Sequence, residues 1–343
     1  MNRRDLIKGA VALPLAASTM SARTAAAPKL VKPKRLVAGD TVGIIAPASA
    51  ATPEAFDRAV ASMTSMGFKV KIGKSARGRL GHLSATDKER LADLHWAFSD
   101  PEIKAVWCIR GGGGAPRLLG DIDYALIKKN PKIFVGFSDI TALHIAISQA
   151  TGLVTFHGPV ASSEYSEYTR TNVLNMLATP SAPLKVVRSE FNNAKESALF
   201  RGVEITKGKA RGRLTGGNLS LLAALAGTPY ALRDIKGKLL FIEEIGEPPY
   251  RVDRLLTQLR QSLDLRSLAG IALGIFDDNN PDNAKDAKPV IDVLRDRLGD
   301  LGIPVYYGLS FGHIRDMVTL PYGTEAELDT TAATLTFVET AVS

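Results

Sequence analysis

The chain has 343 residues, 45% hydrophobic and 23% charged, which is ordinary for a soluble globular protein and long enough for about two domains. Its formal net charge is +8, but residues 1–27 carry +3 of it and four more basic residues fall within 28–35. The remaining body is nearly neutral and has no basic stripe with interleaved aromatic rings, which argues against nucleic-acid binding. A single cysteine, Cys108, excludes an intrachain disulfide, and no Cys/His cluster has the spacing of a zinc site.

Residues 1–27 have the features of an export signal, and 28–35 form a flanking tail. The pair Arg3-Arg4 precedes a moderately apolar run and then small residues that suit cleavage. This resembles a twin-arginine signal, although Asn2 stands where a serine or threonine is usual. An ordinary secretory signal or an uncleaved anchor is the alternative. The apolar run is short for a spanning helix, so we expect an exported, periplasmic protein with no stable membrane span after signal removal.

From residue 36 onward, apolar runs alternate with amphipathic segments. Strands are predicted at "DTVGIIAPAS", "FKVKIG", "KAVWCIR", "KIFVGFS" and "GLVTFHGP". Helices are predicted over 53–67, 86–99 and 139–151. Such alternation is typical of a parallel sheet with helices on both faces, so we expect an N-terminal α/β domain over 36–165.

Residues 180–210 are polar and irregular, so we interpret 166–210 as a linker or crossing segment. The pattern of strands and helices resumes at 211, where we expect a C-terminal mixed α/β domain over 211–335. Its strands are predicted at "GKLLFIEE" and "GIALGIF", and its helices at 248–262 and 289–299.

The stretch "KIFVGFSDITALH" places Ser138 between an apolar strand and a helix, two residues after Gly136. Enzymes often expose a nucleophilic serine on such a turn, because the N–H groups at the start of the helix are free. The backbone N–H of Asp139 is then a candidate oxyanion donor. The motif is G-F-S-D rather than G-x-S-x-G, and a serine here also suits a helix N-cap, so the motif alone leaves both roles open.

Four successive glycines, Gly111 to Gly114, follow the strand that ends in "CIR". Such a loop lets the backbone approach a ligand closely and exposes N–H groups. We therefore consider the N–H groups of Gly112 and Gly113 for the other half of an oxyanion hole. A phosphate cradle is a rival interpretation, but neither G-K-[ST] nor G-x-G-x-x-G is present. A plain flexible turn is the third.

A general base and its carboxylate partner must come from elsewhere in the chain. His313 lies in a glycine-flanked turn before the strand "MVTLPYG", a good place for an exposed imidazole. His144 is expected on a helix face and His157 at a sheet edge. Glu243 is the first of three glutamates after the apolar strand "LLFI", where a carboxylate can hold one imidazole nitrogen. A solvated strand end is the alternative for these glutamates.

Seven motifs in order carry a resemblance to a known family. They are "GIIAPAS", "RGGGGAPRLL", "VGFSDITALH", "FHGP", "LTGGNLSLLAALAGTPY", "LLFIEEIGEPPYRVDRLLTQL" and "GHIRDMVTLPYG". Together they resemble the LD-carboxypeptidase family of serine peptidases, which includes muramoyltetrapeptide carboxypeptidases and microcin-immunity peptidases. The resemblance covers residues 36–330.

The resemblance implies a triad of Ser138 as nucleophile, Glu243 as orienting carboxylate and His313 as base, at a site between two domains. It implies hydrolysis of the amide between an L-centre and a C-terminal D-amino acid, such as D-alanine, in a peptidoglycan-derived peptide. No metal or other cofactor is implied, and the protein is expected to be a homodimer. Cleavage of microcin-like acyl or peptide–nucleotide conjugates is an alternative, as is a catalytically inactive muropeptide-binding protein.

Two further residues are candidates for substrate binding. Asn218, in "LTGGN", matches a polar residue of the family, and a helix N-cap is its alternative role. Arg110 is a candidate cation for the substrate's C-terminal carboxylate, for which Arg251 and Arg315 also qualify. The chain departs from the family at Gly113, where the loop usually has an aromatic residue in R-G-G-Y-G. It also departs in its export signal, since the tetrapeptide-recycling members are cytoplasmic.

Overall fold

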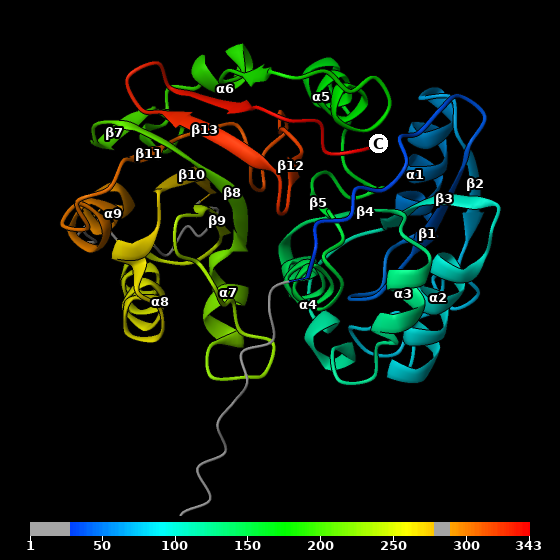
Figure 1. Ribbon diagram of the computed structural model, residues 1–343. Helices are drawn as coiled ribbons and strands as arrows, with labels where there is room; N and C mark the ends of the chain where they lie inside the picture. Colours follow the sequence, from blue (N-terminus) through cyan, green and yellow to red (C-terminus); the bar gives the residue numbers. More distant parts are fainter. Residues whose placement is uncertain (1–27, 278–288) are drawn as a thin grey trace, which may run out of the picture.

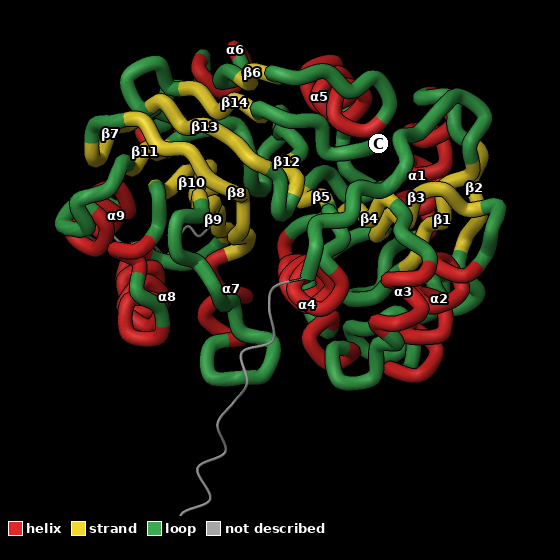
Figure 2. Tube along the Cα trace, viewed as in Figure 1, coloured by secondary structure: helices red, strands yellow, loops and turns green. Residues whose placement is uncertain are grey.

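The computed structural model describes residues 28–277 and 289–343, so the export signal expected at 1–27 lies outside the described residues (Figure 1). The strands form two sheets in two lobes, each packed with helices (Figure 2). Both lobes combine strands with helices, which confirms the α/β class predicted from the sequence. Within these two ranges, we find no helix with the length and apolar character needed to cross a bilayer.

The N-terminal sheet has six strands in the order β12-β5-β4-β3-β1-β2. Neighbours from β5 to β2 are parallel, whereas β12 pairs antiparallel with β5. Strands covered on both faces read as continuous apolar runs, and all four residues of β4 are buried. The bounds are β1 (Thr41–Ile45), β2 (Lys69–Ile72), β3 (Ile103–Cys108), β4 (Ile133–Gly136), β5 (Phe156–His157) and β12 (Leu320–Pro321).

Helices α1, α2 and α3 of this lobe begin at side-chain caps, whereas α4 has none. Thr52 caps α1, which has Pro53 at its first position, and Thr86 forms a capping box with Glu89 at the start of α2. In Figure 1, α1 lies on one side of the sheet and α2, α3 and α4 lie on the other. The bounds are α1 (Pro53–Ser65), α2 (Asp87–Ser99), α3 (Tyr124–Lys129) and α4 (Thr141–Thr151).

The C-terminal sheet has eight strands in the order β6-β14-β13-β8-β9-β10-β11-β7. The four strands from β8 to β11 are parallel, and every other pair is antiparallel. The strand bounds are β8 (Lys209–Asn218), β9 (Leu239–Ile245), β10 (Gly270–Asp277), β11 (Val305–Tyr307), β13 (Glu325–Asp329) and β14 (Thr334–Phe337). The helix bounds are α7 (Leu219–Leu225), α8 (Pro249–Ser262) and α9 (Val290–Leu298).

The segment 166–210, expected to be a linker, contains regular structure. It holds α5 (Glu167–Leu177), β6 (Leu184–Val186), α6 (Glu190–Asn193) and β7 (Val203–Thr206). β6 and β7 form the two opposite edges of the larger sheet, so the segment completes the C-terminal lobe as well as crossing to it. Its elements are three or four residues long except for α5, too short to give a periodic pattern.

The flanking tail is attached to the body rather than extended from it. The N–H of Arg35 donates to the carbonyl of Ser343 (3.0 Å), and the N–H of Ser343 donates to the carbonyl of Pro33 (2.9 Å). Lys32 also forms an ion pair with Glu339 (2.8 Å). The first described residues and the last residues of the chain are therefore held side by side.

The two lobes meet where β4 of one sheet and β8 of the other end. The backbone N–H of Asn218, at the end of β8, donates to Thr141 Oγ1 at the start of α4 (3.0 Å). The ring of Phe241 in β9 packs edge-on against His157 of β5, with centroids 5.2 Å apart. A continuous hydrophobic core runs through both lobes. Ligand sites in parallel sheets lie beyond the carboxyl ends of the strands, so this junction is where a site is expected.

Candidate active site

Ser138 sits on a strained turn between β4 and α4. Its φ is +64°, in the left-handed region that residues other than glycine rarely adopt, and such strain costs about 1–3 kcal/mol. A short 3₁₀ turn over Ser138–Ile140 leads into the helix, and the neighbours of Ser138 on both sides are buried while Ser138 itself is partly exposed. The turn therefore presents the hydroxyl-bearing residue to the surface of the junction.

The glycine loop after β3 packs directly against this turn. A Cβ on Gly111 would lie 2.9 Å from Ser138 Cβ and 3.2 Å from the backbone nitrogen of Asp139, so only glycine permits this approach. The N–H of Ala115, which follows the four glycines, donates to Asp139 Oδ2 (2.7 Å). Burial raises the pKa of Asp139, and that hydrogen bond opposes the shift. The Asp139 side chain thus ties the loop to the turn.

A third loop, after β1, completes this side of the site. The N–H of Gly113 donates to Ser49 Oγ (3.0 Å), and a Cβ on Gly112 would fall 2.4 Å from the same hydroxyl. Neither Gly112 nor Asp139 donates its backbone N–H to another group within the described part of the chain. The sequence analysis did not single out Ser49, and its only signal was its position just after the buried strand in "GIIAPAS".

Arg110 precedes the glycine loop and is exposed. Its Nη1 donates to the carbonyl of Ala50 (3.3 Å), and it makes no ion pair among the described residues. The other two candidate cations are engaged elsewhere. Arg251 pairs with Glu247 (3.3 Å), and Arg315 pairs with a neighbouring glutamate and aspartate.

The structure brings His313 and Glu243 together. His313 Nδ1 lies 2.7 Å from Glu243 Oε2. Glu243 is fully buried at the carboxyl end of β9, and the His313 side chain, in the loop after β11, is 15% exposed. The geometry fixes which imidazole nitrogen faces the carboxylate and leaves Nε2 for another partner.

The pKa values of this pair shift as expected for an ion pair. Burial is the largest single effect and favours the neutral form of each group, but the attraction between them and the weaker effects of their neighbours together outweigh it. The pKa of His313 is therefore raised, through the charge and hydrogen bond of Glu243 and, more weakly, the charges of Glu244 and Asp277. The pKa of Glu243 is lowered, chiefly by the charge and hydrogen bond of His313.

Phe137 joins the serine turn to the histidine. Its ring centroid lies 4.7 Å from that of His313, and Phe137 directly precedes Ser138 in the chain. Within the described residues, neither Ser138 Oγ nor His313 Nε2 has a hydrogen-bond partner. Hydrogen bonds between catalytic groups are often long in a free enzyme and shorten when substrate binds.

Asn218 and Glu244 form a separate polar cluster behind the pair. Asn218 caps α7 by accepting from the N–H of Leu221 (3.3 Å), and its Nδ2 donates to Glu244 Oε1 (3.0 Å). Glu244 also accepts from the N–H and hydroxyl of Ser220 and from the N–H of Ile245. Burial and the neighbouring Glu243 raise the pKa of Glu244. The two adjacent glutamates thus face different partners, which the sequence pattern did not distinguish.

The other four histidines lie apart from this arrangement or behind it. His82 is exposed, and His95 Nε2 accepts from the N–H of Asp123 (2.9 Å). His144 is fully buried and its Nε2 lies 2.8 Å from the carbonyl of Gly136. His157 is also fully buried, beside Phe137 and Phe241.

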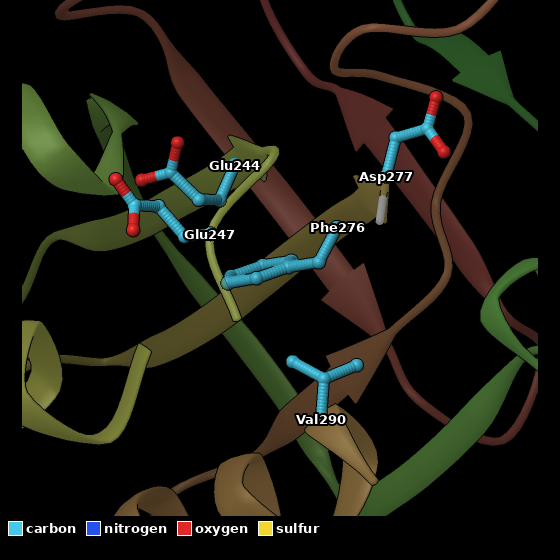
Figure 3. A pocket seen from close by; sticks show the side chains of 5 residues that line it. All are labelled: Glu244, Glu247, Phe276, Asp277 and Val290. Carbon is cyan, nitrogen blue, oxygen red and sulfur yellow. The ribbon is translucent and has the colours of Figure 1, made fainter. Parts of the chain in front are cut away.

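A small hollow lies next to the site at the ends of β9 and β10 (Figure 3). It has room for about one water molecule, about 10 Å³. Its lining side chains are Glu244, Glu247, Phe276, Asp277 and Val290. In residues 28–277 and 289–343, no group of three His, Cys, Asp or Glu side chains is arranged to hold a metal ion.

A serine on a strained strand-to-helix turn, an imidazole that packs on the residue before it, and a buried carboxylate that holds the imidazole are groups of the kinds that serine hydrolases use. The chain belongs to the LD-carboxypeptidase family. The family's N-terminal domain matches residues 42–158, and its C-terminal domain matches residues 211–328. This confirms the resemblance seen in the sequence motifs, and the chain is a peptidase of this family.

Relatives cover almost the whole of the described chain. The probable murein peptide carboxypeptidase of Bacillus subtilis (strain 168) is 43% identical over 303 residues, covering 88% of this chain and 93% of the relative. The murein tetrapeptide carboxypeptidase of Pseudomonas aeruginosa is 34% identical over 298 residues, covering 84% and 92%. The crystal structure of an MccF-like protein from Bacillus anthracis str. Ames is similar with a TM-score of 0.78 and 32% identity, covering 89% and 98%.

Proposed function

We propose that this protein is a serine-type LD-carboxypeptidase that releases the C-terminal D-amino acid, such as D-alanine, from murein tetrapeptides. One observation carries the proposal. The buried Glu243 holds His313 at 2.7 Å, and that imidazole packs on the residue that precedes the strained Ser138. Two relatives named as murein peptide and murein tetrapeptide carboxypeptidases support the choice of substrate class.

In the proposed reaction, Ser138 Oγ attacks the carbonyl carbon between the L-centre and the D-residue. His313 Nε2 takes the serine proton, and the carbonyl oxygen becomes an oxyanion. The tetrahedral intermediate then collapses, the C–N bond breaks, and His313 passes the proton to the leaving amine. Water, deprotonated by the same imidazole, hydrolyses the acyl-enzyme. Glu243 keeps Nδ1 oriented and stabilises the imidazolium in both halves of the reaction.

The backbone N–H groups of Gly112 and Asp139 are the proposed oxyanion donors. Gly112 belongs to the loop that packs on the Ser138 turn, and Asp139 belongs to the turn itself. Within the described residues, neither N–H donates to another group. The N–H of Gly113, the other glycine considered, instead donates to Ser49 Oγ. An oxyanion donor typically contributes about 3–4 kcal/mol to lowering the barrier.

Arg110 is the proposed partner of the substrate's C-terminal carboxylate. It is exposed beside the glycine loop and, unlike Arg251 and Arg315, makes no ion pair among the described residues. A guanidinium can hold a carboxylate with two parallel hydrogen bonds, which would select peptides that end at the released residue. Asn218 caps helix α7 and donates a hydrogen bond to Glu244. These contacts support a role for Asn218 in holding the residues around the site in place.

We also propose that the protein is exported by the twin-arginine route, acts on periplasmic muropeptides and works as a homodimer. The paired Arg3 and Arg4 support the route. Cell fractionation of the wild-type protein and of an Arg3→Lys/Arg4→Lys variant tests it, because the variant should stay in the cytoplasm. Sedimentation of the mature protein tests the dimer.

Cleavage of acyl or peptide–nucleotide conjugates is the second candidate, favoured by the similarity to the MccF-like structure. The purified protein should be incubated with a panel of muropeptides and acyl–nucleotide conjugates, and the products identified by mass spectrometry. Loss of one D-alanine from a tetrapeptide supports the first function, and cleavage of conjugates alone supports the second. A catalytically inactive binding protein would bind but leave every substrate intact.

The variant Ser138→Ala tests the role of the serine: it should fold normally and release no D-alanine. Alanine removes the nucleophile and leaves the rest of the site in place. Full activity of this variant would refute the triad assignment.

A further inference from the structure

The loop that carries His313 crosses from one sheet to the other. It begins after β11 in the C-terminal sheet and ends at β12 in the N-terminal sheet. Its base is closed by a hydrogen bond from the N–H of Val318 to the carbonyl of Ser310 (2.8 Å). Gly312, next to His313, has a φ of +114°, and a Cβ there would lie 2.8 Å from the carbonyl of Ile275. The path of the backbone into His313 is therefore tightly constrained.

Helix α5 holds the far side of this loop through one hydroxyl. Thr169 Oγ1 donates to the carbonyl of Arg315 (3.0 Å) and accepts from the N–H of Met317 (3.0 Å). Thr169 is fully buried. A single side chain thus satisfies two backbone groups of the loop, two and four residues after His313.

Helix α6 holds the same loop at two more points. Asn192 Nδ2 donates to the carbonyl of Asp316 (2.8 Å) and to Ser310 Oγ (3.2 Å). Ser189 donates its hydroxyl to Asp316 Oδ2 (2.5 Å) and its N–H to Ser310 Oγ (2.8 Å). Each of these four residues is at most 5% exposed.

We propose that Thr169 and Asn192 are positioning residues that fix the His313 loop, and that the segment 166–194 has this role in the reaction. The inference rests on the proposed function, in which His313 is the base. Buried hydrogen bonds are directional, and an apolar contact of the same size would leave the loop free to shift. A shift of about 1 Å in a catalytic group can cost on the order of 10²-fold in rate.

The charged groups around His313 provide a readout of its position. They are Glu243 and Glu244 on β9, Asp277 on β10, His157 on β5, and Arg315 and Asp316 on its own loop. The first three raise the pKa of His313. Loosening the loop lengthens the contact with Glu243, so the pKa of His313 should fall toward its ordinary value. A loss of folded protein alone would not move this pKa.

The variants Asn192→Ala and Thr169→Val test the proposal on a murein tetrapeptide. We expect kcat to fall about 10- to 100-fold with KM within about threefold, and the acid limb of the kcat/KM profile to move to lower pH. Asn193→Ala and Thr171→Val are matched controls, since these residues lie on the same two helices but are exposed. Both controls should behave as the wild type.

A second measurement does not depend on turnover. In the Ser138→Ala background, NMR of the His313 ring should give a lower pKa when Asn192→Ala or Thr169→Val is added. Unchanged kcat and an unchanged His313 pKa in folded variants would overturn the proposal. If Asn192→Ala does not fold, Thr169→Val, which keeps the side-chain volume, decides alone. Should His313→Ala keep full activity, the proposed function fails, whereas the NMR result still decides whether the two residues position the ring.

Discussion

Replacing Glu243 with glutamine should slow the reaction strongly while leaving the fold intact. Glutamine keeps the shape of the side chain but removes the charge that faces His313 Nδ1 at 2.7 Å. At an effective dielectric constant of about 20, a carboxylate and an imidazolium with charge centres 3–4 Å apart attract by about 4–6 kcal/mol. This attraction is present only after His313 has taken the serine proton, so it acts mainly on the transition state.

The expected loss in kcat is therefore about 10³- to 10⁴-fold, since each 1.36 kcal/mol changes a rate tenfold. The assay is the initial rate of D-alanine release from a murein tetrapeptide, with the melting temperature measured in parallel. Glu247→Gln is the control, because Glu247 pairs with Arg251 and does not contact the imidazole. A loss below tenfold for Glu243→Gln in a folded protein would refute the role of this carboxylate in stabilising the imidazolium.

Three further predictions follow from the same geometry. Since the pKa of His313 is raised and the base must be neutral, kcat/KM should rise with pH through an apparent pKa above 6.5, measured as a pH–rate profile. His144 and His157, whose pKa values burial lowers to about 3 and about 4, should stay neutral from pH 5 to 8; a ring titration by NMR in that range would contradict this. Gly111→Ala should displace the Ser138 turn, with lower activity and a lower melting temperature, whereas Gly113→Ala should keep the melting temperature because its Cβ meets nothing within 4 Å.

Much of the parallel-sheet framework could be predicted from the sequence. Strands β1, β3 and β4 are mostly apolar runs, and the helices between them begin at residues such as Thr52 and Thr86 that cap helices in any context. The strand predicted at "MVTLPYG" contains β12, but its pairing with β5 in the N-terminal sheet could not be predicted, because a two-residue strand carries no pattern that identifies its partner. Strands β6 and β7 could not be predicted, because each is only three or four residues long and is defined by its pairing at an edge of the larger sheet.

Some features of the candidate site could likewise be predicted from the sequence, and others could not. Ser138 and the glycine loop follow buried strands, and this position in the sequence indicates the carboxyl edge of a parallel sheet. Which glutamate faces the histidine depends on the pleat of β9, where successive side chains point to opposite faces. Glu243 therefore meets His313 while Glu244 meets Asn218. The observed roles of Ser49 and Asp139 could not be predicted from the sequence. Each role depends on a hydrogen bond to a loop that is distant in the chain.

The return of the chain from the C-terminal sheet to β12 ties the His313 loop to both lobes. The histidine loop is attached at one end to β11 and at the other to β12, which pairs with β5 in the sheet that also carries Ser138. A change in the angle between the lobes would therefore have to break the β12–β5 pairing, or the hydrogen bond from Asn218 to Thr141, before it separated His313 from the serine turn. The proposed nucleophile and the proposed base are thus linked through the fold itself, because the loop of His313 ends in a strand of the sheet that carries Ser138.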